Sequence, residues 1–238
     1  CCRSFDVAGI QPDGSIASIG ETVEFFHLVE EVTEAEGRPY VDDLFRIAQT
    51  DSLTDDDVVR CRNASEFLVK LHSIKVRNDI LYKRHIRDLI GHGEMLMGVI
   101  DTYPDLTKLD FTTPEEIAEI EMKAVLWRNR IKHMGHRLSR IHGDYHPFGN
   151  IRFKQDNSMV ALDLSREEYG EPADDISALT MNYVFVSVWQ TGRFVDSLRR
   201  LIEIFFETYM AETGDEELVR VIAPFYAFRG FVVAHPLY

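Results

Sequence analysis

The chain carries Arg140-Ile-His-Gly-Asp-Tyr-His-Pro-Phe-Gly-Asn150 and, after a short segment, Val160-Ala-Leu-Asp-Leu-Ser-Arg166. The segment between them, residues 151–159, predicts two short strands around the polar turn Gln155-Asp-Asn-Ser158. Because a hairpin pairs the residues on either side of its turn, it brings the second stretch back beside the end of the first.

The predicted hairpin folds Asp163 back beside Asp144 and Asn150, so that three oxygen-bearing side chains meet at one edge of a small sheet. Carboxylate and amide oxygens suit a hard divalent cation, and a remaining carboxylate suits acceptance of the proton of an attacking hydroxyl. The pattern therefore favours a phosphoryl-transfer site.

The loop His142-Gly-Asp-Tyr-His-Pro-Phe-Gly-Asn150 resembles the H-G-D-x-H-P-x-N catalytic loop of the aminoglycoside phosphotransferase and choline kinase family, distant relatives of the protein kinases with their H-R-D-x-x-x-x-N loop. Two later motifs extend the resemblance. Leu162-Asp-Leu-Ser165 is similar to the protein-kinase D-F-G, and Pro172-Ala-Asp-Asp-Ile-Ser177 to the family's P-x-x-D-L-A. The resemblance implies an α+β, protein-kinase-like fold: a remnant of a small β-rich N-terminal lobe and a mainly α-helical C-terminal lobe that carries the catalytic hairpin.

The resemblance also implies a small-molecule kinase, which transfers a phosphoryl group from ATP to a hydroxyl group of a small molecule. In that case Asp144 orients the hydroxyl and accepts its proton, while Asp163 and Asn150 ligate a magnesium ion bound with the nucleotide. His142 is expected to order the loop. Asp175 is expected to accept backbone N–H groups of the loop from outside the reacting centre.

The loop departs from the family pattern by one residue. Five residues, Tyr145 to Gly149, separate Asp144 from Asn150, where the family usually has four. Gly149 is the natural inserted residue, since glycine fits a bulge at little steric cost. Two interpretations of His146 stay open: packing within the loop, or lining the acceptor pocket.

The N-terminal residues predict strands at 5–10, 15–19 and 23–29, with a turn at 11–14. By resemblance, Glu30, Glu31 and Val32 form the hinge whose backbone groups bind the adenine of ATP; an ordinary strand end is the alternative. We expect two domains, residues 1–32 as the remainder of the β lobe with the hinge, and residues 33–238 as the helical lobe.

The first lysine of the chain is Lys70, so no lysine precedes the expected hinge. The resembled family has its glycine-rich loop, its phosphate-binding lysine and the glutamate partner of that lysine in this upstream part. We therefore expect either a fragment without most of the small lobe or an inactive relative. The start at Cys1, without an initiator methionine, favours the fragment.

Helix signals fill the remainder of the chain. Thr54 with three following aspartates, and Thr113 followed by Pro-Glu-Glu116, predict helix N-termini. Two helical stretches broken at 91–93 are expected within 78–103, and closing helices at 176–190, 193–210 and 215–233. The helical segment before the loop is where the resembled family builds its acceptor pocket.

The composition is acidic and hydrophobic enough for a substantial core, with a formal charge of −14 and 45% hydrophobic residues. An acidic surface argues against a nucleic-acid partner and is compatible with a cationic acceptor, although it also confers solubility. The acidic loop 167–175 is likewise either a floor for an amine-bearing acceptor or a solvated loop. Three cysteines without a paired pattern indicate a reducing cytoplasm, and no apolar run reaches the roughly 18 residues of a membrane span.

Three other interpretations remain open. His142, Asp144 and His146 alternate as H-x-D-x-H, which on a strand would place three ligands for zinc or iron on one side, although Gly143 and Pro147 favour a loop. A kinase-like module that binds nucleotide without catalysis would also lack the upstream lysine. A protein kinase acting on polypeptides is disfavoured, because no A-P-E segment follows the hairpin.

Overall fold

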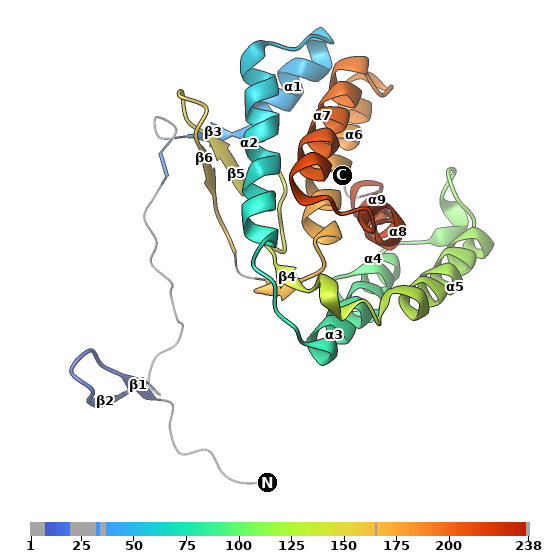
Figure 1. Cartoon of the computed structure of the whole chain (residues 1–238). Helices are drawn as coiled ribbons and strands as arrows, with labels where there is room; N and C mark the ends of the chain where they lie inside the picture. The colour runs from blue at the N-terminus through green and yellow to red at the C-terminus, as the bar shows by residue number, and fades with distance from the viewer. Residues whose placement is uncertain (1–7, 20–31, 34–36, 165, 237–238) are drawn as a thin grey trace. The chain divides into compact units, whose positions relative to one another are not determined.

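The computed structural model describes residues 8–19, 32–33, 37–164 and 166–236 (Figure 1). The chain divides into two compact units, Cys1–Val32 and Thr33–Tyr238. Small antiparallel sheets combine with long helices, and the second unit is mainly helical, which confirms the predicted α+β class. The interpretation of the first unit as the remainder of a β lobe stays a prediction.

The described part of the first unit is a β-hairpin. Strand β1 (Ala8–Ile10) pairs antiparallel with β2 (Ile16–Ser18), as two of the predicted strands require. Gly14 lies in the turn with φ +83°, a left-handed conformation that favours glycine. The third predicted strand, 23–29, lies outside the described residues.

The second unit opens with strand β3 (Arg38–Pro39) and helix α1 (Tyr40–Thr50), a helix that none of the sequence signals above predicts. Its apolar residues nevertheless recur at three- and four-residue steps, and Tyr40, Leu44 and Ile47 are at most 1% exposed. No side chain caps its N-terminus. Burial of this apolar stripe is therefore what stabilises α1.

Helix α2 (Asp55–His72) begins where its capping signal predicts. The side chain of Thr54 accepts the N–H of Asp57 at 3.3 Å, and the Asp57 carboxylate accepts the N–H of Thr54 at 2.7 Å. This reciprocal capping box fixes the start of the helix, which packs mainly along α7 (Asp196–Thr213).

A three-stranded antiparallel sheet, in the order β3-β5-β6, contains the predicted catalytic hairpin. Its strands are β5 (Ile151–Phe153) and β6 (Met159–Ala161), which confirms the prediction. Helix α2 anchors the turn, because Arg60 and Asn63 both donate hydrogen bonds to Asn157, whose φ is +63°. The hairpin is therefore fixed at its tip as well as at its base.

A two-stranded sheet lies at the base of the loop and the hairpin. Strand β4 (Ser139–Arg140) pairs antiparallel with β7 (Tyr169–Gly170), so the two ends of the segment that contains the loop and the hairpin lie side by side. Beside this base the buried Arg137 donates to the buried Glu171 at 2.6 Å and to Asp215 at 2.8 Å. This ion-pair network ties the chain before the loop to the chain after it.

The helices between α2 and the loop follow their sequence signals. Helices α3 (Asp79–Gly91) and α4 (Leu96–Asp101) confirm the expected break at 91–93. Helix α5 (Pro114–Ile131) starts at a capping box in which Thr113 accepts the N–H of Glu116 at 3.2 Å. Short 3-10 turns lie at Leu106–Lys108 and Gly135–Arg137.

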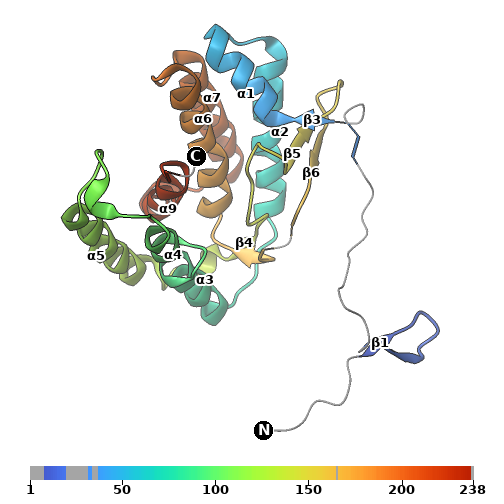
Figure 2. The same cartoon turned by 180° about the vertical axis from the view of Figure 1, so that it is seen from behind.

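Helix α6 (Ala173–Thr191) is the central element of the second unit, in contact with α1, α7 and α9 (Ala223–Val233) (Figures 1 and 2). It begins three residues before the predicted start, so Asp174 and Asp175 belong to its first turn. Because α6 touches helices on several sides, residues all around it are buried.

The prediction of one closing helix over 215–233 is wrong. The chain forms a short helix α8 (Leu218–Val221) and then α9, with Pro224 in the first turn of α9. Proline has no N–H and cannot continue a preceding helix, but it fits the first turn of a new one. In the described ranges of the chain, none of the helices combines the length and the apolar character needed to cross a membrane.

Candidate active site

The predicted catalytic loop, residues 142–150, is held by the carboxylate of Asp175. The two oxygens of its carboxylate accept the backbone N–H of His142 at 2.7 Å and that of Gly143 at 2.8 Å. The ring of His72 lies 3.1 Å from the same carboxylate and 2.8 Å from the hydroxyl of Tyr209. These groups connect the loop to α6, α2 and α7, so the loop conformation depends on three helices.

The carboxyl of Asp175 is fully buried, and burial by itself raises its pKa. Hydrogen bonds and charge from His72, together with the N–H of His142, outweigh burial and leave the pKa of Asp175 below its ordinary value. The group is therefore an anion at neutral pH. Gly143 follows with φ +84°, and a Cβ there would lie 3.2 Å from the Cβ of Arg166, so the loop needs glycine at this position.

The loop folds around Asp144 through His142 and Asn150. Ring atom Nδ1 of the buried His142 accepts the N–H of Asp144 at 3.3 Å. The amide of Asn150 donates to the carbonyl of Asp144 at 2.9 Å. The extra residue is absorbed in a turn over 147–150, where Gly149 has a negative φ and faces open space. The inserted residue therefore does not turn the Asn150 side chain away from the loop.

The hairpin brings the backbone of Asp163 close to Asn150, because the N–H of Leu162 donates to the carbonyl of Asn150 at 2.8 Å. Asp163 is exposed and has a left-handed φ of +59°. The amide nitrogen of Asn150 is used in its bond to Asp144, so its oxygen is the atom suited to a cation. An amide oxygen and an exposed carboxylate form a donor set that fits magnesium.

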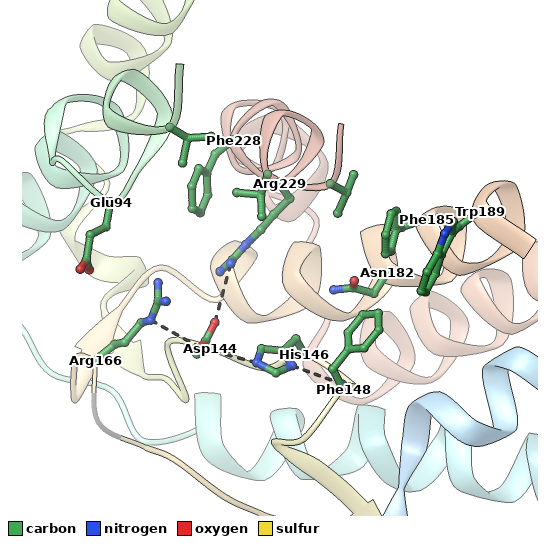
Figure 3. A pocket seen from close by; sticks show the side chains of 13 residues that line it. Glu94, Asp144, His146, Phe148, Arg166, Asn182, Phe185, Trp189, Phe228 and Arg229 are labelled. Carbon is green, nitrogen blue, oxygen red and sulfur yellow. Dashed lines mark hydrogen bonds and ion pairs between the residues drawn. The ribbon is translucent and has the colours of Figure 1, made fainter. Parts of the chain in front are cut away.

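A cavity of about 710 Å³ opens beside the catalytic loop (Figure 3). Its polar lining residues are Glu94, Asp144, His146, Arg166, Asn182 and Arg229. Its apolar lining residues are Phe148, Phe185, Trp189, Phe228, Val99, Val232 and Val233. The loop, α4, α6 and α9 all contribute, whereas Asn150 and Asp163 are not among the lining residues. Asp144 therefore lines this cavity, whereas Asn150 and Asp163 do not contribute to its lining.

Three nitrogen-bearing side chains surround the Asp144 carboxylate (Figure 3). Arg166 Nε lies 3.5 Å from Oδ2, His146 Nε2 lies 3.7 Å from Oδ2, and Arg229 Nη1 lies 3.9 Å from Oδ1. Arg229 also donates to the buried Asp174 at 2.7 Å. The carboxylate is 14% exposed, so it is reachable from the pocket while held by cations.

Burial lowers the pKa of His146, although the charge of Asp144 acts in the opposite direction. The ring is therefore neutral at neutral pH. Its Nδ1 accepts the N–H of Phe148 at 3.2 Å, so its proton is on Nε2, toward Asp144. His146 therefore packs within the loop, against Phe148, and also lines the cavity, so the structure does not choose between its two interpretations.

Several residues of this pocket carry no sequence signal of their own. Arg166 follows the hairpin, and Arg229 lies on α9, far away in the sequence. Phe185 and Trp189 are spaced four apart on α6, a spacing that is also typical of a buried helix face. Neither Glu167 nor Glu168 lines the pocket.

The acidic loop 167–175 contributes no residue to the lining of this cavity, and its role as a floor for an amine-bearing acceptor stays a prediction. The carboxylate of Glu167 instead lies 2.6 Å from Nδ1 of the buried His85. The residue next to this loop that does line the pocket is Arg166, which carries the opposite charge.

The expected adenine hinge comprises Glu30, Glu31 and Val32. Glu30 and Glu31 lie outside the described residues, and Val32 belongs to the first unit. The hinge role of all three stays a prediction.

The zinc interpretation of H-x-D-x-H finds no supporting geometry. His142 is buried against Tyr145, whereas His146 lines the pocket. Among the residues with described positions, no group of three or more His, Cys, Asp or Glu side chains is placed to hold a metal ion. The residues of the motif form a loop rather than a strand.

No protein-family model matches the sequence, and no curated protein matches it. Among solved structures, glucosamine kinase aligns over 82% of this chain and 50% of its own, with 16% identity and a TM-score of 0.54. A second crystal form of that enzyme aligns over 83% and 54%, with 16% identity and a TM-score of 0.48. An aminoglycoside phosphotransferase from Streptomyces rimosus, in complex with ADP and streptomycin, aligns over 74% and 65%, with 15% identity and a TM-score of 0.41.

The chain spans about half the length of glucosamine kinase. At 16% identity the similarity concerns the fold, and it agrees with the mainly helical second unit described above. The chain therefore has the protein-kinase-like fold seen in glucosamine kinase, α+β with a mainly helical C-terminal lobe.

Proposed function

We propose that the protein is a small-molecule kinase that transfers the terminal phosphoryl group of ATP to a hydroxyl group. The observation that carries this proposal is the position of Asp144. Its carboxylate lies on the wall of a 710 Å³ cavity, at the end of a loop that Asp175 clamps by two hydrogen bonds. A cavity of this size suits a small organic acceptor.

In this proposal Asp144 orients the acceptor hydroxyl and accepts its proton. Positioning contributes more than proton removal, because the transition state of phosphoryl transfer is loose. The rigid loop supports this role, since His142 and Asn150 fix the backbone on both sides of Asp144. Asp175 acts as a positioning residue.

Asn150 and Asp163 would hold magnesium, and the hinge at Glu30, Glu31 and Val32 would hold the adenine. When bound, the cation supplies neutralisation of charge on the phosphate oxygens. The adjacency of Leu162 to Asn150 supports a shared ligand set for Asn150 and Asp163. The kinase named among the structural neighbours supports a small-molecule acceptor in general.

The test is ADP formation by the full-length protein with ATP, magnesium and a panel of hydroxyl-bearing small molecules. Asp144→Asn is expected to lower kcat by about 10²- to 10⁴-fold, as the loss of a general base does, with nucleotide binding nearly unchanged. Asp163→Asn is expected to weaken binding of magnesium-nucleotide. Asp156→Asn, in the exposed turn of the same hairpin, is the matched control and should leave turnover unchanged.

Two outcomes would count against the proposal. Retained turnover in Asp144→Asn would remove the catalytic assignment. If the full-length protein binds nucleotide but forms no ADP with any acceptor of the panel, the non-catalytic binding module would be favoured.

A further inference from the structure

The pocket beside Asp144 has a charged end and an aromatic end (Figure 3). At the charged end, Arg166 approaches the Asp144 carboxylate through Nε and Arg229 approaches it through Nη1. Glu94 is the one further carboxylate among the lining residues. The reacting hydroxyl of an acceptor would therefore sit between one carboxylate and two cations.

The two arginines are held differently. Arg229 is 10% exposed and is fixed by its 2.7 Å bond to the buried Asp174. Its Nε is buried and has no hydrogen-bond partner within the described ranges. Arg166 is 42% exposed and approaches Asp144 through Nε at 3.5 Å, a long contact. Arg166 is thus the cation that can turn from Asp144 to a ligand at little cost.

The aromatic end of the pocket is formed mainly by Phe185 and Trp189 on α6. The rings of Phe185 and Trp189 stack, with centroids 5.5 Å apart and planes inclined by 14°. The ring centroid of Phe148 lies 6.2 Å from that of Phe185, and Phe45 packs edge-on against Trp189 with centroids 5.7 Å apart. Trp189 is nevertheless 54% exposed. A large aromatic ring that is packed on one side and open to a cavity on the other is suited to stacking with a planar apolar group.

We propose that the acceptor combines an aromatic or apolar ring with an acidic group next to the reacting hydroxyl, and that polyamine sugars are disfavoured. This inference rests on the proposed function and names the substrate class of the same pocket. The ring would lie on Phe185 and Trp189. The acidic group would bind Arg166, which releases the carboxylate of Asp144 for the hydroxyl. An ammonium group in that place would meet two guanidinium groups instead.

A competing role for the same arginines is contact with the transferred phosphate, since arginine binds phosphate as well as carboxylate. The two roles differ in what Arg166 discriminates. An arginine that binds the acidic group changes the affinity for acidic ligands only. An arginine that binds phosphate changes the behaviour of all acceptors to the same extent.

The experiment uses three biphenyls that share one hydroxymethyl group and differ in the substituent beside it: a carboxylate, a carboxamide or an aminomethyl group. Binding to the 238-residue chain is followed by tryptophan fluorescence. The chain has two tryptophans, and Trp127 lies on α5 outside the pocket lining, so Trp127→Phe makes Trp189 the reporter. Trp189→Phe is the control in which the ligand-dependent signal should disappear.

The carboxylate is expected to bind about tenfold more tightly than the carboxamide, the usual worth of a charge-assisted hydrogen bond, and the aminomethyl compound least. Arg166→Gln should remove the advantage of the carboxylate and leave the carboxamide unchanged. Arg193→Gln, an exposed arginine paired with Asp51 and outside the pocket lining, should keep the advantage.

Equal binding of the three compounds, or tightest binding of the amine, would overturn the inference. Equal weakening of all three by Arg166→Gln would show that this arginine does not discriminate acidic ligands and would overturn the inference as well. The fluorescence measurement needs no turnover, whereas the proposed function is tested by ADP formation. Selective binding of the carboxylate without ADP formation would refute the kinase activity alone. Phosphorylation of the hydroxyl group of amine-bearing acceptors, in preference to acidic ones, would refute the acceptor class alone.

Discussion

Replacing Asp175 by asparagine removes the clamp under the catalytic loop while preserving the shape of the side chain. Both carboxylate oxygens accept a backbone N–H, one from His142 at 2.7 Å and one from Gly143 at 2.8 Å. Asparagine has one acceptor oxygen, so one of the two N–H groups must face another donor. No other group can take over, because Asp175 is fully buried.

The expected loss has two parts. A hydrogen bond to a charged group contributes about 1.5–3 kcal/mol, and a buried donor without a partner costs about 1–3 kcal/mol. We therefore expect Asp175→Asn to lower the free energy of unfolding by about 3–5 kcal/mol. For a chain of this size such a loss lowers Tm by on the order of 10 °C.

Urea and thermal unfolding followed by circular dichroism measure this loss. The matched control is Asp196→Asn, because Asp196 is an exposed aspartate in the first turn of α7, as Asp175 is in the first turn of α6. The control removes the favourable interaction of a carboxylate with the helix dipole but no loop clamp. A loss in Asp175→Asn no larger than in Asp196→Asn would refute the reasoning.

The pH dependence provides an independent check. The pKa of Asp175 is lower in the folded protein than its ordinary value of 3.8, because the hydrogen bonds and charges around it outweigh burial. Its contribution to stability is therefore complete above that ordinary value and is lost as the pH falls through the lower folded pKa. Wild-type protein should show this acid-dependent loss, and Asp175→Asn should lack that part of it.

Two further predictions concern the remainder of the helical lobe. Arg137→Met is expected to lower the free energy of unfolding by about 3–5 kcal/mol, because it leaves the fully buried Glu171 without its cation. The control Arg193→Met breaks an exposed ion pair and should change the free energy of unfolding little. Urea unfolding measures both variants, and equal losses would contradict the prediction. Cys61 is fully buried, and burial raises the pKa of its thiol to about 12. When the two N-terminal cysteines are replaced by serine, a thiol reagent should therefore label Cys61 only after the protein unfolds. Fast labelling of the folded protein would contradict this prediction and show that the buried face of helix α2 opens.

Local features of the fold were readable from the sequence. The caps at Thr54 and Thr113 are formed by residues three positions apart, and the hairpin over 151–159 joins neighbours across a short turn. Such interactions need no distant partner, so their residue types suffice to predict them. Helix α1 was missed although Tyr40, Leu44 and Ile47 carry a helical stripe, because no capping residue marks its start.

The pair of α8 and α9 shows the opposite limit. The apolar residues of 215–233 fit one continuous helical pattern, but the chain bends before Pro224. A proline in the first turn of a helix marks the start of that helix, and it also ends any helix that comes before it. The periodicity alone did not separate the two helices.

The sequence by itself determined the hairpin and the helix starts and predicted the loop 142–150, because each depends on residues within a few positions of one another. Only the tertiary structure decided the surroundings of Asp144. Arg166 follows the hairpin in the chain, Arg229 lies on α9, and the stacked Phe185 and Trp189 lie on α6. In the sequence, each arginine alone is consistent with a surface charge, and each aromatic residue alone is consistent with a core side chain. They become one pocket because packing of α4 and α9 and of α6 and α9 brings these segments together, and a contact between residues so far apart leaves no local pattern.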